Sequence, residues 1–332
     1  MAVQPRQKIL VTREVFQETL DYLTQHFEVE SNQADSPFSA DMLAQRLADK
    51  AGAICALTDR VDTPLLERCP QLRAVCNIAV GYNNIDVEAC TARGVIATNT
   101  PGVLDGSTAD FAWTLLLAAA RRLSEAEAYL RNGEWHGWYL KQLLGVDIHG
   151  ATLGIIGMGR IGRAVAKRAA GFDMTVLYHN RNRLAADVER RFNAIRVEMN
   201  ELLARADFVV LLVPYSQATH HLIGDEELAR MKSSAVLVNV ARGGVVDDAA
   251  LIDALKNGTI RAAGLDVYED EPKFNPGFLE LKNVVLAPHV ASSTEATRSA
   301  MAMTAARNLV AALNGAEPPN LLNPGCRATG AG

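Results

Sequence analysis

The sequence lacks the features expected of a nucleic-acid-binding or membrane protein. Its 33 Lys and Arg residues against 38 Asp and Glu residues give a formal net charge of −5, so no basic excess is available for a nucleic-acid surface. The longest apolar helical stretch, near residues 111–120, is too short to cross a bilayer. The polar segment Met1–Lys8 leads into an apolar strand-like run and does not have the form of a signal peptide. We therefore expect a cytoplasmic protein whose partners are neither membranes nor nucleic acids.

Cysteine pairing and metal binding also have little support in the sequence. The five cysteines are scattered and form no C-x-x-C pair, which is typical of reduced thiols in a cytosol. His220 and His221 are adjacent rather than at helical ligand spacing, and no H-E-x-x-H is present. The sequence predicts no metal centre.

The middle of the chain contains a strand, a glycine turn, a helix and a second strand in succession. The apolar run Leu153–Ile156 is followed by Gly157, Gly159 and Gly162 in the order G-x-G-x-x-G, and a second apolar run spans Met174–Tyr178. The first glycine permits a tight turn, the second leaves room for a pyrophosphate, and the third lets the helix approach the strand. Phosphates would bind the unpaired N–H groups at the positive end of the helix. An ordinary glycine-rich turn is the alternative, but the surrounding elements favour a dinucleotide-binding unit.

The residues after the second strand bear on which nicotinamide dinucleotide is bound. An acidic residue here would bind the ribose 2′-hydroxyl of NAD, but the sequence over 178–183 is Y-H-N-R-N-R, with Asn180 and no acid. Arg181 and Arg183 carry guanidinium groups, whose geometry suits a 2′-phosphate. We therefore expect NADPH to be the preferred cofactor, with NAD as the alternative if the arginines only solvate a loop.

Strands and helices alternate along the chain, which is typical of α/β proteins with parallel sheets. From Leu153 onward six strands are expected, the number of a Rossmann doubly wound sheet. Before the turn at Asn99–Gly102 the expected strands belong to a second α/β domain with a flavodoxin-like fold, and a last helix over Thr294–Leu313 is expected to return to it. We therefore expect a dinucleotide-binding domain over residues 102–289 and a discontinuous substrate-binding domain over residues 1–101 and 290–332.

Three expected strands of the dinucleotide-binding domain are followed by polar residues of complementary types, namely Arg242, Glu271 and His289. Ligands of doubly wound sheets bind beyond the carboxyl ends of the strands, so these side chains are expected to meet there. An arginine would bind the carboxylate of a 2-oxo acid and polarise its carbonyl. A histidine would donate a proton as hydride reaches the carbon, and a carboxylate would hold the imidazolium. Each residue alone has an ordinary structural alternative, but together they indicate a hydride-transfer site.

These motifs resemble those of the D-isomer-specific 2-hydroxyacid dehydrogenases. They are A-V-G-Y-N-N-I-D at 79–86, N-V-A-R-G-G at 239–244, G-L-D-V at 264–267, E-P at 271–272 and P-H at 288–289, so the resemblance covers nearly the whole chain. It implies a homodimer with Arg242, Glu271 and His289 as catalytic residues, and it implies that the N–H groups of Val80 and Gly81 bind the substrate carboxylate. It also implies cofactor contacts from Thr108, Arg160, Ile161, Val213, Thr219, Val240 and Asp266.

Within that family, the glycine turn and the arginines after Tyr178 are most similar to glyoxylate/hydroxypyruvate reductases and 2-ketogluconate reductases. The expected activity is NADPH-dependent reduction of glyoxylate, hydroxypyruvate or 2-ketogluconate to a D-2-hydroxy acid. An NAD-dependent dehydrogenase of other specificity is one alternative, and a nucleotide-sensing, corepressor-like binding protein is another. The aromatic stretch around Trp138 is expected to pack against the core; the alternative is that Trp138 reaches a substrate site, including that of a partner subunit.

Overall fold

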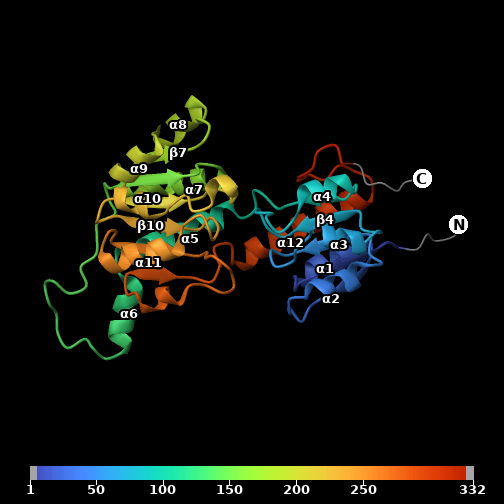
Figure 1. The fold of residues 1–332 in the computed structure, drawn as a ribbon, viewed down its shortest axis with the longest axis horizontal. Helices are drawn as coiled ribbons and strands as arrows, with labels where there is room; N and C mark the ends of the chain where they lie inside the picture. The colour runs from blue at the N-terminus through green and yellow to red at the C-terminus, as the bar shows by residue number, and fades with distance from the viewer. Residues whose placement is uncertain (1–5, 327–332) are drawn as a thin grey trace. The chain divides into compact units, whose positions relative to one another are not determined.

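The computed structural model describes residues 6–326, and the chain divides into two compact units (Figure 1). Unit 1 consists of the chain up to Leu104 and from Thr294 onward, and unit 2 is Asp105–Ser293. Both are α/β units built on parallel sheets. Among the described residues, no helix combines the length and the apolar character that a membrane span requires.

Unit 1 contains a five-stranded parallel sheet in the order β2-β1-β3-β4-β5, which is the flavodoxin-like order expected from the sequence. Its strands are β1 (Lys8–Val11), β2 (Glu28–Ser31), β3 (Gly52–Cys55), β4 (Ala74–Asn77) and β5 (Ile96–Thr98). The helices α2 (Ala40–Leu47), α3 (Thr63–Arg68) and α4 (Val87–Ala92) contribute to the core on one face. The other face is covered by α1 (Gln17–Thr24) and α12 (Glu295–Leu313). The last helix of the chain therefore completes the first unit, because it packs on β3 and β4.

Unit 2 contains a seven-stranded parallel sheet in the order β12-β11-β10-β9-β6-β7-β8. With β6 counted as the first strand, this is the doubly wound order with one further strand at the β12 edge, so the expected Rossmann fold is confirmed. The strands are β6 (Thr152–Ile156), β7 (Thr175–His179), β8 (Ala194–Arg196), β9 (Phe208–Leu211), β10 (Val236–Asn239), β11 (Ala262–Leu265) and β12 (Val284–Leu286). The expected count of six omitted β8, a three-residue edge strand whose Ile195 is half exposed.

Helices cover both faces of the unit 2 sheet. The core on one face includes α5 (Asp105–Ala120) and α7 (Arg160–Ala169), which are joined where the indole N–H of Trp113 donates to the carbonyl of Val165 at 3.1 Å. The core on the other face includes α9 (Met199–Arg205), α10 (Asp225–Arg230) and α11 (Asp248–Asn257). Strands covered on both faces are buried along their whole length; all four residues of β9 and of β10 are buried, and only Asn239 at the end of β10 is polar. The remaining α-helices of unit 2 are α6 (Leu123–Arg131) and α8 (Ala186–Phe192).

The segment after α6 does not pack against the core. No residue of α6 is buried, and the chain that follows it runs as an extended loop away from the sheet (Figure 1). Trp135, Trp138, Tyr139 and Leu140 in this loop are exposed by 56%, 78%, 60% and 78%. The expectation that the aromatic stretch packs against the core is therefore wrong. The sequence shows that this segment is rich in aromatic residues, but it does not show which surface they pack against.

Candidate active site

The candidate site residues of unit 2 follow strands that end at one edge of its sheet. β6, β9, β10, β11 and β12 are parallel neighbours in register, so their carboxyl ends lie together. Gly157 follows β6, Arg242 follows β10, Glu271 follows β11 and His289 follows β12. The strand order reverses between β6 and β9, and such a switch point is where doubly wound sheets bind dinucleotides.

The glycine turn has the local geometry that a bound pyrophosphate requires. Gly157 has a φ of +99°, and a Cβ there would lie 2.7 Å from the carbonyl carbon of Leu212. A Cβ on Gly162 would lie 2.6 Å from the carbonyl oxygen of Gly157, so only glycine allows this approach of helix α7 to the turn. Gly159 differs, because a Cβ there would meet nothing within 4 Å. The turn therefore leaves open space beside the N-terminus of α7, and the residues present fit a dinucleotide.

The arginines after β7 are in different environments. Arg183 makes two bonds of 3.0 Å to the carboxylate of Glu189, which also accepts a 2.5 Å hydrogen bond from the hydroxyl of Tyr178. These two donors lower the pKa of Glu189. Arg181 is exposed and has no ion-pair partner within residues 6–326. Arg181 is therefore more available to an incoming phosphate than Arg183. The sequence motif did not show this, because Glu189 lies outside it and is brought back by α8.

Asn180 closes the glycine turn. Its Oδ1 accepts a hydrogen bond of 2.7 Å from the N–H of Met158. The side chain is therefore committed to holding the turn, at the position where an acid would bind the ribose of NAD.

Glu271 and His289 form a hydrogen-bonded pair. His289 Nδ1 lies 2.7 Å from Glu271 Oε2, and Glu271 Oε1 accepts the N–H of Tyr268 at 2.9 Å. Since the partner of Nδ1 is a carboxylate, we assign the proton to Nδ1, which leaves Nε2 for a ligand. Burial raises the pKa of Glu271, but the hydrogen bond from His289, its charge and that of Arg242 outweigh this and hold the pKa below its usual value. The pair thus has the form of an acid/base group supported by an ionised carboxylate.

Asp266 fixes the backbone on both sides of His289. Its carbonyl accepts the N–H of His289 at 2.8 Å. Its buried carboxylate accepts the N–H groups of Val290 and Ala291 at 2.7 and 2.9 Å. Burial raises the pKa of Asp266 in spite of these two hydrogen bonds. His289 has a φ of +54°, a region that non-glycine residues occupy only when their surroundings hold them there.

Arg242 lies on a loop that is shaped by Asn239. The buried Asn239 accepts the N–H of Ala241 at 3.0 Å and donates to the carbonyl of Arg242 at 3.2 Å. One guanidinium nitrogen of Arg242 donates to the carbonyl of Ala241 at 2.7 Å. Burial lowers the pKa of Arg242, against the raising effect of the Glu271 carboxylate. Because an arginine stays charged in proteins, the loop presents a partly buried cation on the same edge as the Glu271–His289 pair.

The Val80–Gly81 loop of unit 1 is held by two asparagines that the sequence analysis did not single out. Asn99 donates to the carbonyl of Val80 at 2.7 Å, and Asn77 donates to the carbonyl of Gly81 at 2.9 Å. The N–H groups of Val80 and Gly81 donate to no acceptor within residues 6–326. The two carbonyls are thus fixed while the two amide groups are left for a ligand.

The other residues expected to contact the cofactor all belong to unit 2. Thr219 uses its hydroxyl locally, since it accepts the N–H of Ser216 at 2.8 Å and donates to the carbonyl of Pro214 at 2.8 Å. The remaining residues lie at the start of α5, at the start of α7, after β9 and after β10; they are Thr108, Arg160, Ile161, Val213 and Val240.

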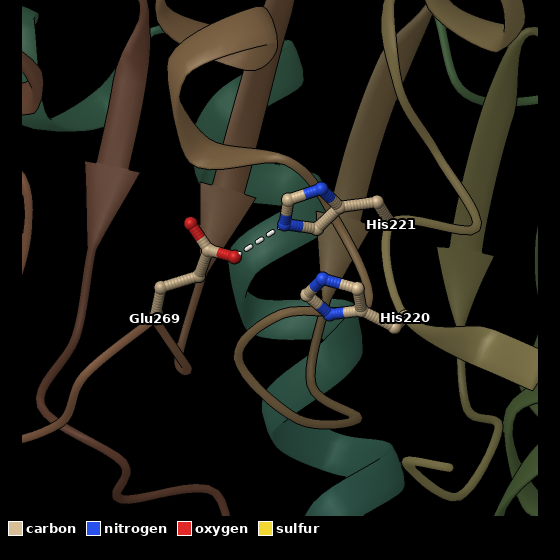
Figure 2. Close-up of side chains that lie close together, drawn as sticks. All are labelled: His220, His221 and Glu269. Atoms are coloured by element: carbon tan, nitrogen blue, oxygen red, sulfur yellow. Dashed lines mark hydrogen bonds and ion pairs between the residues drawn. The ribbon is translucent and has the colours of Figure 1, made fainter. Parts of the chain in front are cut away.

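A cluster that the sequence analysis set aside is formed by His220, His221 and Glu269 (Figure 2). One potential ligand atom from each lies within 4.8 Å of the others. The two imidazole rings stack, with centroids 3.9 Å apart and 25° between their planes. The lone pair of an imidazole nitrogen lies in the plane of its ring, so two nearly parallel rings do not direct lone pairs at one ion. The cluster in this arrangement is a hydrogen-bonded pair, His221 with Glu269, rather than a metal site.

Comparison with known proteins agrees with this geometry. Residues 113–291 match the family model described as D-isomer specific 2-hydroxyacid dehydrogenase, NAD binding domain. A glyoxylate reductase of Thermococcus gammatolerans is 48% identical over 320 residues, which cover 95% of this chain and 96% of that protein.

Two solved structures of reductases are also similar to this chain in fold and in sequence. An NADPH-dependent glyoxylate/hydroxypyruvate reductase of Sinorhizobium meliloti, in complex with NADP and malonate, is 33% identical with a TM-score of 0.87, covering 98% of this chain and 99% of that one. A glyoxylate reductase from Paecilomyes thermophila is 34% identical with a TM-score of 0.87, covering 96% and 99%.

Proposed function

Because the chain belongs to the D-isomer-specific 2-hydroxyacid dehydrogenases, a family of NAD(P)-dependent oxidoreductases, we propose that it reduces glyoxylate and related small 2-oxo acids to D-2-hydroxy acids with NADPH. The observation that carries this proposal is the carboxylate-backed His289, 2.7 Å from Glu271, on the sheet edge that also bears Arg242 and the glycine turn. The proposal assigns dinucleotide binding to unit 2, and it assigns substrate binding to Val80 and Gly81 of unit 1 together with Arg242 and His289 of unit 2.

In the proposed reaction the three residues Arg242, Glu271 and His289 have different tasks. Arg242 binds the 2-oxo acid through the acid's carboxylate and polarises the carbonyl oxygen, for which a charged guanidinium is suited. His289 donates the proton from Nε2 to that oxygen. Glu271 accepts the Nδ1 hydrogen and stabilises the imidazolium before transfer. A nicotinamide dinucleotide held at the glycine turn would supply the hydride for the carbonyl carbon, and with the proton from His289 this balances the reduction to the hydroxy acid.

The N–H groups of Val80 and Gly81 are proposed as further ligands of the substrate carboxylate. This proposal is supported by the two asparagines that hold the carbonyls of these residues and by the absence of protein acceptors for their N–H groups among residues 6–326. Paired backbone N–H groups are common anion ligands.

The proposed homodimer is supported by the exposed loop after α6. Trp135, Trp138, Tyr139 and Leu140 are all more than half exposed, and a soluble monomer seldom leaves such side chains together in water. A second copy of the chain would cover them, and Trp138 is then a candidate to reach the partner's substrate site. The free state of all five cysteines fits the proposed cytoplasmic location.

The NADPH preference predicts a selective loss in an Arg181→Ala variant. Arg181 is exposed and unpaired within residues 6–326, whereas Arg183 is held by Glu189. Loss of one charge-assisted bond to a phosphate is worth about 1.5–3 kcal/mol, so the KM for NADPH is expected to rise roughly 10- to 100-fold. The KM for NADH is expected to change less than about threefold, and Arg183→Ala is the matched control with a smaller effect. Equal losses for both cofactors in Arg181→Ala would contradict phosphate recognition.

The substrate proposal is tested by a panel of glyoxylate, hydroxypyruvate, pyruvate and 2-ketogluconate, each assayed with NADPH and with NADH. Glyoxylate or hydroxypyruvate with NADPH is expected to give the highest kcat/KM. Higher kcat/KM with NADH throughout would favour the NAD-dependent dehydrogenase instead. Binding of NADPH without turnover of any acid would contradict the proposed function and favour a nucleotide-sensing, corepressor-like binding protein.

A further inference from the structure

The loop that carries Arg242 and the loop that carries Glu271 are in van der Waals contact through their backbones. A Cβ on Gly243 would lie 1.6 Å from the carbonyl oxygen of Tyr268, so no other residue fits there without moving one of the loops. Gly244 has a φ of +74°, and a Cβ on it would come within 3.8 Å of a Glu269 carboxylate oxygen. The position of one loop therefore depends directly on the position of the other.

His221 is bound to both loops. Its backbone N–H donates to the carbonyl of Gly244 at 2.7 Å, and two residues later Ile223 donates to the carbonyl of Val245 at 3.1 Å. Its side chain reaches the other loop, where Nε2 lies 2.5 Å from Glu269 Oε1 (Figure 2). His221 has a φ of +48°, a left-handed conformation that costs a non-glycine residue energy unless contacts hold it.

The Glu269 end of this link is also fixed. The N–H of Glu269 donates to Asp248 Oδ2 at 3.2 Å. The other ring nitrogen of His221, Nδ1, lies 3.5 Å from Asp247 Oδ2, and Asp247 caps helix α11 by accepting the N–H groups of Ala249 and Ala250. The pair is therefore anchored to the start of a buried helix, although its side chains are about one-third exposed, 36% for His221 and 33% for Glu269.

We propose that His221 and Glu269 are positioning residues that hold the Arg242 loop against the Glu271 loop, and so set the guanidinium relative to the Glu271–His289 pair. Glu269 stands two residues before Glu271, and His221 is bonded to Gly244, two residues after Arg242. Neither side chain needs to touch the substrate for this role. The inference rests on the proposed function, since it concerns how the same site is assembled.

The test compares Glu269→Ala and His221→Ala with Glu269→Gln, which keeps an oxygen that accepts a hydrogen bond from His221. Because misplacement of a reacting group by about 1 Å costs on the order of 10²-fold in rate, each alanine variant is expected to lose about 10- to 100-fold in kcat/KM for glyoxylate. The KM for NADPH is expected to stay within about twofold, since among residues 6–326 the hydrogen bonds of this pair do not involve Gly157, Gly159 or Gly162. Glu269→Gln is expected to recover most of the lost activity, and Glu226→Ala, an exposed glutamate of α10, is the matched control.

If His221 and Glu269 only stabilised the fold, these variants would give different kinetic results. Alanine variants that retain wild-type kcat/KM, or that lose NADPH and glyoxylate binding equally, would overturn the proposal. A Glu269→Gln variant as poor as Glu269→Ala would also overturn it, because the hydrogen bond would then not be what matters.

Amide hydrogen exchange provides a readout that does not depend on turnover. In Glu269→Ala, peptides covering residues 240–246 and 266–271 are expected to exchange faster than in the wild type, while the peptide covering 152–165 is unchanged. If the wild-type protein reduces none of the four acids, the proposed function fails. The exchange experiment still decides the link between the loops, because unchanged exchange in both loop peptides would overturn it.

Discussion

Replacement of His289 by alanine is expected to lower kcat for glyoxylate reduction by about 10²–10⁴-fold, the usual contribution of a general acid. The imidazole of His289 is held by Glu271 at 2.7 Å through the ring, and the backbone of His289 is held by Asp266 at 2.8 Å through the N–H. Its loss removes the proton donor but none of the groups that shape the glycine turn. The Kd for NADPH, measured by fluorescence titration, is therefore expected to stay within about twofold. A residue that acts only in the chemical step lowers kcat without weakening cofactor binding.

The matched control for this variant is His149→Ala. His149 precedes β6, so it lies at the opposite edge of the sheet from His289, and it is exposed. Its replacement is expected to leave kcat and KM unchanged. A His289→Ala enzyme with wild-type kcat would show that the proton comes from elsewhere, and the proposed mechanism would then be wrong.

Glu271→Gln separates the charge of the carboxylate from its hydrogen bond. The amide oxygen can still accept a hydrogen bond from Nδ1 of His289, but a neutral amide no longer stabilises the imidazolium. The measured kcat for glyoxylate is therefore expected to fall, but by less than in His289→Ala.

In the wild type the pKa of Glu271 is held below its usual value. A carboxyl with a lowered folded-state pKa stabilises the folded protein above its unfolded pKa, and the contribution is lost as the pH falls through the folded value. The contribution of the ionised Glu271 carboxylate to the stability of the fold is therefore expected at neutral pH and is expected to be lost in acid.

The sequence predicted the parts of the site that depend on local chemistry. Gly157, Gly159 and Gly162 were assigned separate roles from their spacing, and the structure gives each the contacts, or the open space, that its role requires. Arg242 and His289 were expected at one edge of the sheet because each follows an expected strand and parallel strands end at a common edge, and the structure places both there. The roles of the glycines and the positions of Arg242 and His289 could be predicted because they depend only on neighbouring residues in the chain and on the common edge at which parallel strands end.

The parts that were missed depend on contacts between distant segments. β2 and β8 are short edge strands without an apolar run, so the periodicity of the sequence did not reveal them. Glu189 lies outside the motif after β7 and reaches Arg183 only because α8 folds back. His221 and Glu269 are 48 residues apart and meet because their loops follow different strands. Adjacent histidines have no distinctive spacing, and only the fold shows that one of them connects two loops.

Replacement of Arg242 by alanine is expected to cause the other large loss, in kcat/KM for the 2-oxo acid. Each hydrogen bond to a charged group contributes about 1.5–3 kcal/mol, so two bonds from one guanidinium to a substrate carboxylate correspond to a loss of roughly 10²–10⁴-fold. The loss is expected in KM as well as in kcat, since the same group binds the carboxylate and polarises the carbonyl. The KM for NADPH is expected to change little, and this difference distinguishes Arg242 from the residues of the glycine turn.

Arg242→Lys tests whether geometry or charge carries this effect. Lysine keeps the positive charge but lacks the planar fork that binds a carboxylate through two bonds, so an intermediate kcat/KM is expected. The side chain of Asn239 holds the loop through the backbone of Ala241 and Arg242, and neither substitution removes these bonds. Arg242→Ala removes the bond from the guanidinium to the carbonyl of Ala241, so the melting temperature should fall by only a few degrees. Full activity in Arg242→Ala, with glyoxylate KM unchanged, would contradict the assignment. Equal activity in the lysine and arginine enzymes would show that charge alone suffices.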